Sequence, residues 1–206
     1  MLSDIIMITK IQIPFSELDI DFKEALRYAG VRGEADPETL KLYSTALSLL
    51  CEEATAKAVY KCYEVTYFEG GVFLGEEKLV SSGLHKFLQG AKRAAILSAT
   101  AGIEADRLIN RYSMIEPSLA LMIDAIAAAG VEALCNSICS GCFCVEKGRR
   151  FSPGYGDFSM EYQKRITEIL NTPLNIGVTL TNSLMLTPTK SVTAVSPLKG
   201  PTENEH

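Results

Sequence analysis

The segment from Pro117 to Cys139 constrains the fold of this chain more than any other part of the sequence. It reads PSLALMIDAIAAAGVEALCNSIC, is rich in alanine, and begins with a proline, which suits the first position of a helix. Only Asp124 and Glu132 carry charge in it, and their spacing of eight residues puts both roughly on one face. Because a helix that is apolar nearly all round must be buried, the sequence predicts a central helix interrupted by two carboxylates.

Length and charge limit the kind of protein to which such a helix can belong. The 206 residues allow one domain, or one domain with a small appendage, and 47% hydrophobic residues suffice for a sizeable core. The formal net charge of −5 comes from acidic residues spread along the chain, so we expect no nucleic-acid partner. His85 and His206 are the only histidines, which disfavours Ser-His-Asp hydrolases and multi-histidine metal sites.

The sequence also argues against a membrane location. Its first residues, MLSDIIMITKIQIPFSEL, lack the basic region and apolar run of a signal peptide. The longest apolar stretch, from Ala125 to Cys135, is about half as long as a bilayer span and contains Glu132. The six cysteines are not dispersed like a disulfide framework. We therefore expect a cytoplasmic protein with no membrane helix.

Helical and strand patterns alternate along the rest of the chain without the regular order of a βαβ protein. Apolar spacing and capping residues predict helices over residues 21–29, 36–57, 84–88, 103–111 and 160–170. Segments that are β-branched or alternate in polarity predict strands over residues 59–68, 72–74, 93–100, 176–180 and 191–195. This mixture predicts a single α+β domain in which helices pack on a twisted antiparallel or mixed sheet.

Four cysteines are crowded at the end of the central helix. Cys135, Cys139, Cys142 and Cys144 have the spacing C-x3-C-x2-C-x-C, and the first three match the spacing of ligands to a radical-SAM iron–sulfur cluster. The same positions form one stripe of a helix, where free cysteine packs as a small hydrophobic residue. Only 62 residues follow Cys144, too few for the barrel of a radical-SAM enzyme. We favour the packing interpretation, with a metal or redox cluster as the alternative.

The segment RRFSPGYGDF, residues 149–158, is the strongest candidate for a ligand loop. Gly154 and Gly156 allow backbone to approach a ligand, Arg150 offers two parallel hydrogen bonds to a carboxylate, and Tyr155 offers a ring face and a hydroxyl. Ser152 and Pro153 complete the loop and join the candidate set. Such a loop suits a small zwitterion or a sulfonium. The alternative is a tight turn in which Arg150 pairs with a neighbouring acid such as Asp157.

The two carboxylates of the central helix bear on this choice. A carboxylate in an apolar helix is costly unless it meets a cation or a hydrogen-bond donor. Glu132 therefore requires Arg150, a lysine or a bound amine as its partner, and we include it in the ligand site. Asp124 fits a position on the helix surface equally well, and is the weaker candidate.

Three consecutive motifs resemble one known family. RFSPGYGDF, the helix SMEYQKRITEIL and the segment IGVTLTNSLMLTPTKSVTAV are similar, in order and spacing, to the S-adenosylmethionine-binding activation domain of cobalamin (vitamin B12)-dependent methionine synthase. That family has an R-x-x-x-G-Y loop before a helix, followed by a segment like T-E-S-x-x-M-x-P-x-x-S-V-S, where Asn182 replaces the glutamate. The resemblance covers roughly residues 94–195 and matches the short stand-alone members of the family.

The resemblance implies a reactivation role in methionine biosynthesis. An activation module presents S-adenosylmethionine to the corrinoid of a partner protein, and methyl transfer restores methylcobalamin. Arg150 would then bind the ligand carboxylate, Tyr155 would contact the ligand, and Glu132 would face it from the helix. The implied partners are a corrinoid-binding methionine synthase subunit and a flavodoxin-type electron donor. The chain would be a component of a methyltransferase system, without catalysis of its own.

The resemblance also divides the chain. Residues 1–92 would be an N-terminal helical and hairpin part of the same domain, residues 93–195 the activation-domain-like core, and residues 196–206 a flexible tail. Two alternatives stay open for the function. One is a module that docks on a corrinoid protein and has a decayed ligand site, and the other is the cysteine-cluster metal or redox protein.

Overall fold

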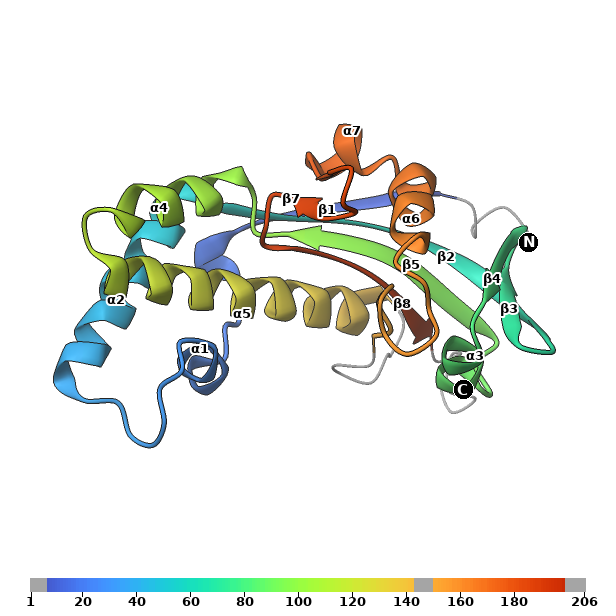
Figure 1. The fold of residues 1–206 in the computed structure, drawn as a ribbon, viewed down its shortest axis with the longest axis horizontal. Helices are drawn as coiled ribbons and strands as arrows, with labels where there is room; N and C mark the ends of the chain where they lie inside the picture. The colour runs from blue at the N-terminus through green and yellow to red at the C-terminus, as the bar shows by residue number, and fades with distance from the viewer. Residues whose placement is uncertain (1–6, 143–149, 199–206) are drawn as a thin grey trace, which may run out of the picture.

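The fold is built on one antiparallel sheet with helices on both faces, as a computed structural model shows for residues 7–142 and 150–198 (Figure 1). The strand order is β4-β3-β2-β5-β8, and β1 pairs with β2 beside this path. The strands are β1 (Thr9–Pro14), β2 (Thr55–Phe68), β3 (Gly71–Leu74), β4 (Glu77–Val80), β5 (Arg93–Thr100) and β8 (Ser191–Leu198). The α+β class and the antiparallel sheet predicted from the sequence are confirmed.

The long strand β2 organises the sheet. Its first part pairs with β1, from Thr55 opposite Pro14 to Tyr60 opposite Thr9, and its last part pairs with β3. On its other side, residues 57–64 pair with β5, and β5 pairs over its whole length with β8. Since successive side chains of a strand point to opposite faces, β2 contributes Ala58 to one core and Val59 to the other.

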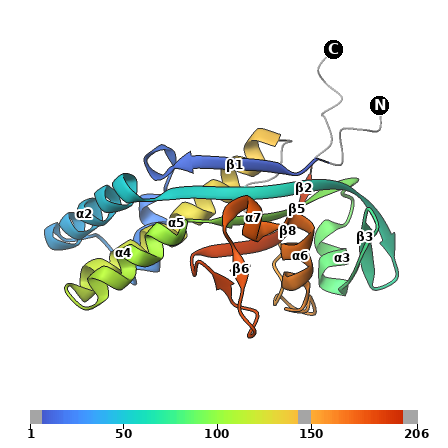
Figure 2. The same ribbon diagram turned by 90° about the horizontal axis from the view of Figure 1, so that it is seen from above.

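The larger core lies between the sheet and helix α5 (Pro117–Cys142), with α1 (Phe22–Tyr28), α2 (Pro37–Glu53) and α4 (Ile103–Ser113) around it. Small residues on this face of the sheet, such as the fully buried Ala58 and Ala99, let α5 lie close to the strands. Gly130 of α5 makes room for the ring of Phe15, which follows β1, because a Cβ at position 130 would lie 2.4 Å from this ring. Figures 1 and 2 show α5 running along one face of the sheet.

The second core lies on the opposite face, under α3 (Ser82–Leu88), α6 (Tyr162–Leu170) and the short α7 (Thr172–Ile176). Ile96 and Val195 of the sheet pack there with Ile166 and Phe158. A short hairpin of β6 (Thr179–Leu180) and β7 (Leu186–Thr187) leads from α7 to β8. The described residues therefore cover both faces of one sheet, with α5 on one face and α6 on the other.

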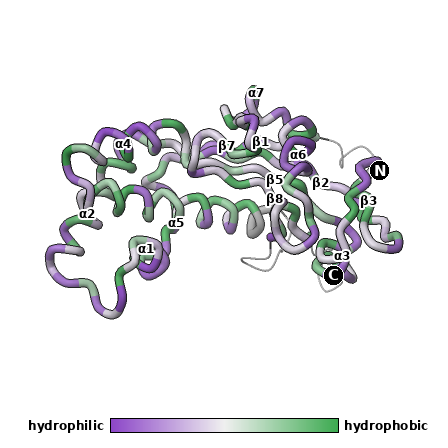
Figure 3. Tube along the Cα trace, in the orientation of Figure 1, coloured by the Kyte–Doolittle hydropathy of each residue, from purple (hydrophilic) through white to green (hydrophobic). Residues whose placement is uncertain are grey.

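The central helix predicted over residues 117–139 is confirmed and is the longest element described. By length and composition, residues 117–138 could cross a membrane. The sequence analysis had expected no membrane helix, because it counted only the apolar stretch from Ala125 to Cys135. In the fold, 67% of the most apolar 18-residue stretch of this helix is buried. A buried core helix of a globular protein can have the same length and composition as a membrane span. Figure 3 shows this hydrophobic helix alongside the hydrophobic strands, so packing accounts for its composition.

Four sequence predictions need correction. The second helix ends at Glu53, earlier than residue 57, because β2 already begins at Thr55 and pairs with β1, a strand that the sequence analysis missed. Residues 176–180 form the end of α7, a turn at Gly177 and the short β6, where one strand was predicted. The last strand continues through Ser196, Pro197 and Leu198, into the predicted tail. The predicted hairpin also gains a further strand, β4.

Candidate functional site

Arg150 and Glu132 lie in direct contact. The Arg150 guanidinium forms an ion pair with the Glu132 carboxylate through Nη2, and its Nη1 donates a hydrogen bond of 2.9 Å to Oδ1 of Asn136. Glu132 and Asn136 are four residues apart on α5 and therefore share a face. The Arg150 side chain is only 9% exposed, whereas that of Glu132 is 34% exposed. The Arg150 side chain is thus the more buried partner, and α5 supplies the partners of both Nη1 and Nη2.

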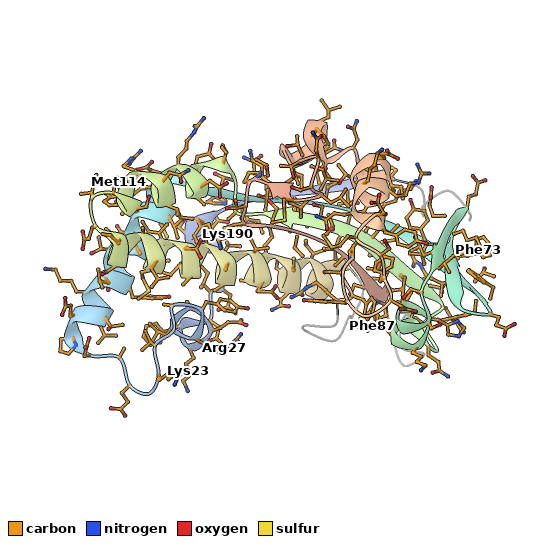
Figure 4. The ribbon with its side chains drawn as sticks, in the orientation of Figure 1. Lys23, Arg27, Phe73, Phe87, Met114 and Lys190 are labelled. Carbon is orange, nitrogen blue, oxygen red and sulfur yellow. The ribbon has the colours of Figure 1, made fainter. Side chains whose placement is uncertain are left out.

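The residue after Arg150 fastens the loop to the sheet. The backbone N–H and C=O of Phe151 exchange two hydrogen bonds of 2.9 Å with Val195 of β8. The Phe151 ring packs in the second core, 5.2 Å from the ring of Phe87 and 6.0 Å from that of Phe158. Neighbouring side chains thus lie on opposite sides of the sheet edge, with Arg150 on the α5 side and Phe151 on the α3 side. Figure 4 labels Phe87 beside this loop.

The two glycines of the loop adopt conformations that other residues rarely take. Gly154 has φ +94° and Gly156 has φ +55°, and Gly154 N–H donates to the Phe158 carbonyl at 2.7 Å. A Cβ on Gly154 would lie 2.6 Å from the sulfur of Met160. Tyr155 is 59% exposed at the tip of this turn. The positive φ angles of this turn thus account for both glycines. The turn also leaves the Tyr155 ring accessible.

Asp157 does not pair with Arg150. Its carboxylate accepts hydrogen bonds from Ser81 Oγ at 2.6 Å and from the backbone N–H groups of Ser82 at 2.6 Å and Gly83 at 2.9 Å. These bonds, that of Ser81 first, hold the pKa of Asp157 below its ordinary value. The alternative of a turn closed by an Arg150–Asp157 pair is therefore wrong, and Asp157 instead ties the loop to the start of α3.

Asp124 occupies a different place from Glu132. Its carboxylate pairs at 2.8 Å with Nζ of Lys190, in the turn before β8. The neighbouring Thr189 is held by Asp106 of α4, through its N–H at 2.8 Å and its hydroxyl at 2.6 Å. Figure 4 shows Lys190 over the middle of α5. Because eight helical residues span about 12 Å, Asp124 lies in an ion pair separate from that of Glu132, and its place in a ligand site stays a prediction.

Helix α1 adds residues that the sequence analysis missed. The hydroxyl of Tyr28 donates to Glu24 Oε1 at 3.0 Å, and Arg27 pairs with the same oxygen at 3.1 Å. Burial, then Glu24, and also the nearby Glu132 raise the pKa of Tyr28. Helix α1 packs on α5, and the charge of Glu132 acts on the Tyr28 hydroxyl. The four-residue spacing of Glu24 and Tyr28 is visible in the sequence, but the packing of α1 on α5 is not.

Two surface pockets lie apart from the ion pair. One of about 530 Å³ lies between α6 and the β6–β7 turn, with Lys164 and Asn182 in its lining. Another, of about 510 Å³, lies between α1 and the start of α2, with Phe22, Arg27 and Leu40 in its lining. Neither is lined by Arg150 or Glu132. The Nη1 and Nη2 atoms of Arg150 have partners within the protein, namely Asn136 and Glu132.

The cysteine cluster falls largely outside the described part of the chain. Cys144 is outside it, and the side chains of Cys139 and Cys142 are not described, whereas Cys135 is buried in the core with α5. Among the described residues, no group of three or more His, Cys, Asp or Glu side chains is placed to hold a metal ion. The packing interpretation applies to Cys135, and the alternative for the whole cluster stays a prediction.

Comparisons with known proteins bear on the fold. No family model matches the chain, and no curated protein is detectably similar to it in sequence. Among solved structures, the chain resembles the crystal structure of the MetH reactivation domain bound to AdoHcy, with a TM-score of 0.75 and 16% sequence identity. The match covers 97% of this chain and 81% of the other. The fold of this protein is therefore that of the MetH reactivation domain.

Proposed function

We propose that this chain is an S-adenosylmethionine-binding subunit that supports the reductive methylation of a corrinoid carried by a partner protein. The partner would be a cobalamin-dependent methionine synthase or a related corrinoid methyltransferase. The observation that carries the proposal is the buried Arg150, paired with Glu132, on a fold whose solved neighbour holds AdoHcy. AdoHcy is what S-adenosylmethionine becomes when its sulfonium methyl group is transferred.

The residues suit the amino-acid headgroup of such a ligand. A guanidinium binds a carboxylate with two parallel hydrogen bonds, and a carboxylate binds an ammonium group. Arg150 and Glu132 offer these two groups side by side, and the exposed ring of Tyr155 lies in the same loop. We further propose that Ser152, Pro153, Gly154 and Gly156 shape the loop around the ligand.

The proposed chemistry makes small demands on the protein. The methyl group of a sulfonium is already activated, so the chain need only orient the S–CH3 bond and exclude water. No general acid or base is needed, which agrees with a chain that has only two histidines. The corrinoid, once reduced by one electron from a flavodoxin-type donor, would accept the methyl group on the partner protein. This proposal places the system in the cytoplasm.

A binding measurement tests the proposal. We expect S-adenosylmethionine titrated into the full chain to give a saturable signal in calorimetry, and Arg150→Ala to weaken binding by about 100-fold, since a charge-assisted contact is lost. Arg165→Ala is the matched control, because Arg165 pairs with Glu77 at 2.8 Å on the far side of the sheet. Equal affinity of the wild type and Arg150→Ala would remove the carboxylate contact from the proposal.

One observation favours a second candidate, a docking module with a decayed ligand site. The Arg150 guanidinium already has Glu132 and Asn136 as partners within the chain. A purely structural role of this ion pair would leave a fold that contacts a corrinoid protein without a ligand of its own. Co-purification with a corrinoid protein, together with no calorimetric signal from S-adenosylmethionine, would support this candidate against the first.

A further inference from the structure

We propose that the pocket between α1 and the start of α2 is a second binding site, which takes a small amphipathic anion. Such a ligand is an apolar ring system or a short acyl chain that carries one carboxylate or sulfonate. The pocket has a volume of about 510 Å³, within the range of roughly 300–1,000 Å³ that is typical of small-molecule sites. Its lining includes neither Arg150 nor Glu132, so this inference goes beyond the proposed function and does not depend on it.

The end of α1 builds the floor of the pocket. Gly30, with φ +78°, follows the helix, and the N–H of Val31 donates a hydrogen bond of 3.0 Å to the carbonyl of Leu26. This Schellman pattern turns the chain back, so that the apolar residues before and after the glycine meet. Leu26, which is 7% exposed, and Val31 both line the pocket. The floor is therefore set by the backbone hydrogen bonds of the turn.

Exposed apolar side chains form the walls. Phe22 of α1 is 39% exposed and Leu40 of α2 is 44% exposed. The Phe22 ring is held in place by an edge-to-face contact with Tyr43, with 4.8 Å between the ring centroids. Ala35 adds to the lining from the segment that joins the two helices. A ligand that covers these side chains would remove apolar surface from water, which would drive its binding.

Exposed cations select the sign of the ligand. Lys23 and Arg27 also line the pocket, and their spacing of four residues puts them on one face of α1. Figure 4 shows both on the outer side of this helix. Arg27 pairs with Glu24 at 3.1 Å, whereas Lys23 has no carboxylate partner within the part of the chain that the structure describes. Since Glu34 is the one acidic residue among the described lining residues, the lining carries a net positive charge.

These two features define the class of ligand. An organic cation would be repelled by Lys23 and Arg27, and a small inorganic anion would not cover the apolar walls. Because exposed ion pairs are weak, the walls supply most of the affinity and the cations supply the selectivity. S-adenosylmethionine carries a sulfonium charge, and we expect it to bind outside this pocket.

A fluorescent probe tests the site in the full chain. We expect anilinonaphthalene sulfonate, an apolar ring system with one sulfonate, to give a saturable rise in fluorescence. Octanoate should displace this probe. Octylammonium has a chain of the same length and the opposite charge, and should displace it about 5- to 10-fold more weakly, as expected for exposed charges. An excess of S-adenosylmethionine should leave the signal unchanged. These competitions use the wild type alone.

Two substitutions locate the bound probe. Ala35→Phe fills the pocket while adding apolar surface, so we expect it to lower the affinity for the probe by about tenfold or more. Lys23→Glu reverses an exposed charge and should lower this affinity by about fivefold. Lys164→Glu is the matched control, because it makes the same charge reversal in the pocket beside α6, and should leave the affinity unchanged. Circular dichroism compares the folding of each variant with that of the wild type.

Each contrary result would overturn a stated part of the proposal. No saturable signal from the wild type, or equal affinity of the wild type and Ala35→Phe, would overturn the site. Equal displacement by octanoate and octylammonium, or an unchanged affinity in Lys23→Glu, would overturn the preference for an anion. Displacement of the probe by S-adenosylmethionine would overturn the independence of the two sites. A chain that binds the probe but not S-adenosylmethionine would keep this site and lose the proposed function.

Discussion

Two halves of helix α5 carry one acidic side chain each, and the two have different tasks. Asp124 in the first half pairs with Lys190, and the two side chains are 40% and 22% exposed. Glu132 in the second half pairs with Arg150, which is buried and has Asn136 as a further partner. An ammonium group on a flexible chain is compatible with water, whereas a buried guanidinium requires a fixed partner. The comparison separates an ion pair that fastens a turn from one that holds a buried guanidinium against α5.

The strongest test of this difference removes the anion from the buried pair. We expect Glu132→Ala to lower the free energy of unfolding by about 3 kcal/mol, because the buried Arg150 guanidinium then loses the Glu132 carboxylate. Urea unfolding followed by circular dichroism measures it. A loss no larger than that caused by Lys190→Ala would contradict the contrast between the two halves.

Removal of the cation should cost less. We expect Arg150→Ala to lower the free energy of unfolding by about 2 kcal/mol, since the partly exposed Glu132 regains water once its partner is gone. The same urea experiment on the double variant sharpens the test, because side chains in contact give non-additive effects. Strict additivity of the two single changes would mean that the pair makes no net contribution.

Removal of Lys190 should cost the least of these three substitutions. We expect Lys190→Ala to lower the free energy of unfolding by less than about 1 kcal/mol, since the remaining Asp124 carboxylate is 40% exposed and regains water, and Asp106 still holds the turn through Thr189. The effect of Lys190→Ala should shrink further at 1 M salt, whereas that of Glu132→Ala should persist. Thermal unfolding at two salt concentrations compares them.

The smallest expected difference appears only in acid. The pKa of Asp157 in the folded chain lies below its ordinary value of 3.8, so its contribution is fully present above that value and is lost as the pH falls through the folded pKa. We expect Asp157→Asn to flatten the fall in unfolding free energy below about pH 4, while changing the response near pH 7 little. Urea titrations at pH 3, 4 and 7 check this. An unchanged acid limb would separate Asp157 from the stability of the loop.

Much of the sheet and the central helix could be predicted from the sequence because their signals are local. Strand β5 lies at residues 93–100 as predicted, since a run of apolar residues there ends at the turn before Gly102. Strand β1 was missed although its residues alternate regularly in burial, because it is short and its pairing partner β2 lies far along the chain. The predicted strand at 176–180 failed because Asn171 and Gly177, both with positive φ, instead delimit α7.

For the candidate site too, the sequence predicted what depends on local signals and missed contacts between distant segments. The sequence indicated that Glu132 needs a cation and named Arg150 among the candidates, because burial of an unpaired charge is costly whatever the fold. Asp124 could not be separated from Glu132 by spacing alone, since Lys190 reaches it only through the turn before β8. Tyr28 was missed because the charge of Glu132 acts on it through the packing of α1 on α5, a contact between distant segments.

The pair of backbone hydrogen bonds between Phe151 and Val195 fixes more than a loop. Along an extended backbone, adding or deleting one residue ahead of Phe151 exchanges the sides to which consecutive side chains point. The cation would then turn toward the aromatic cluster, and the ring would turn toward α5. The positions of Arg150 and Phe151 therefore depend on the register between Phe151 and Val195. A change in chain length ahead of Arg150 preserves these positions only if Phe151 stays opposite Val195.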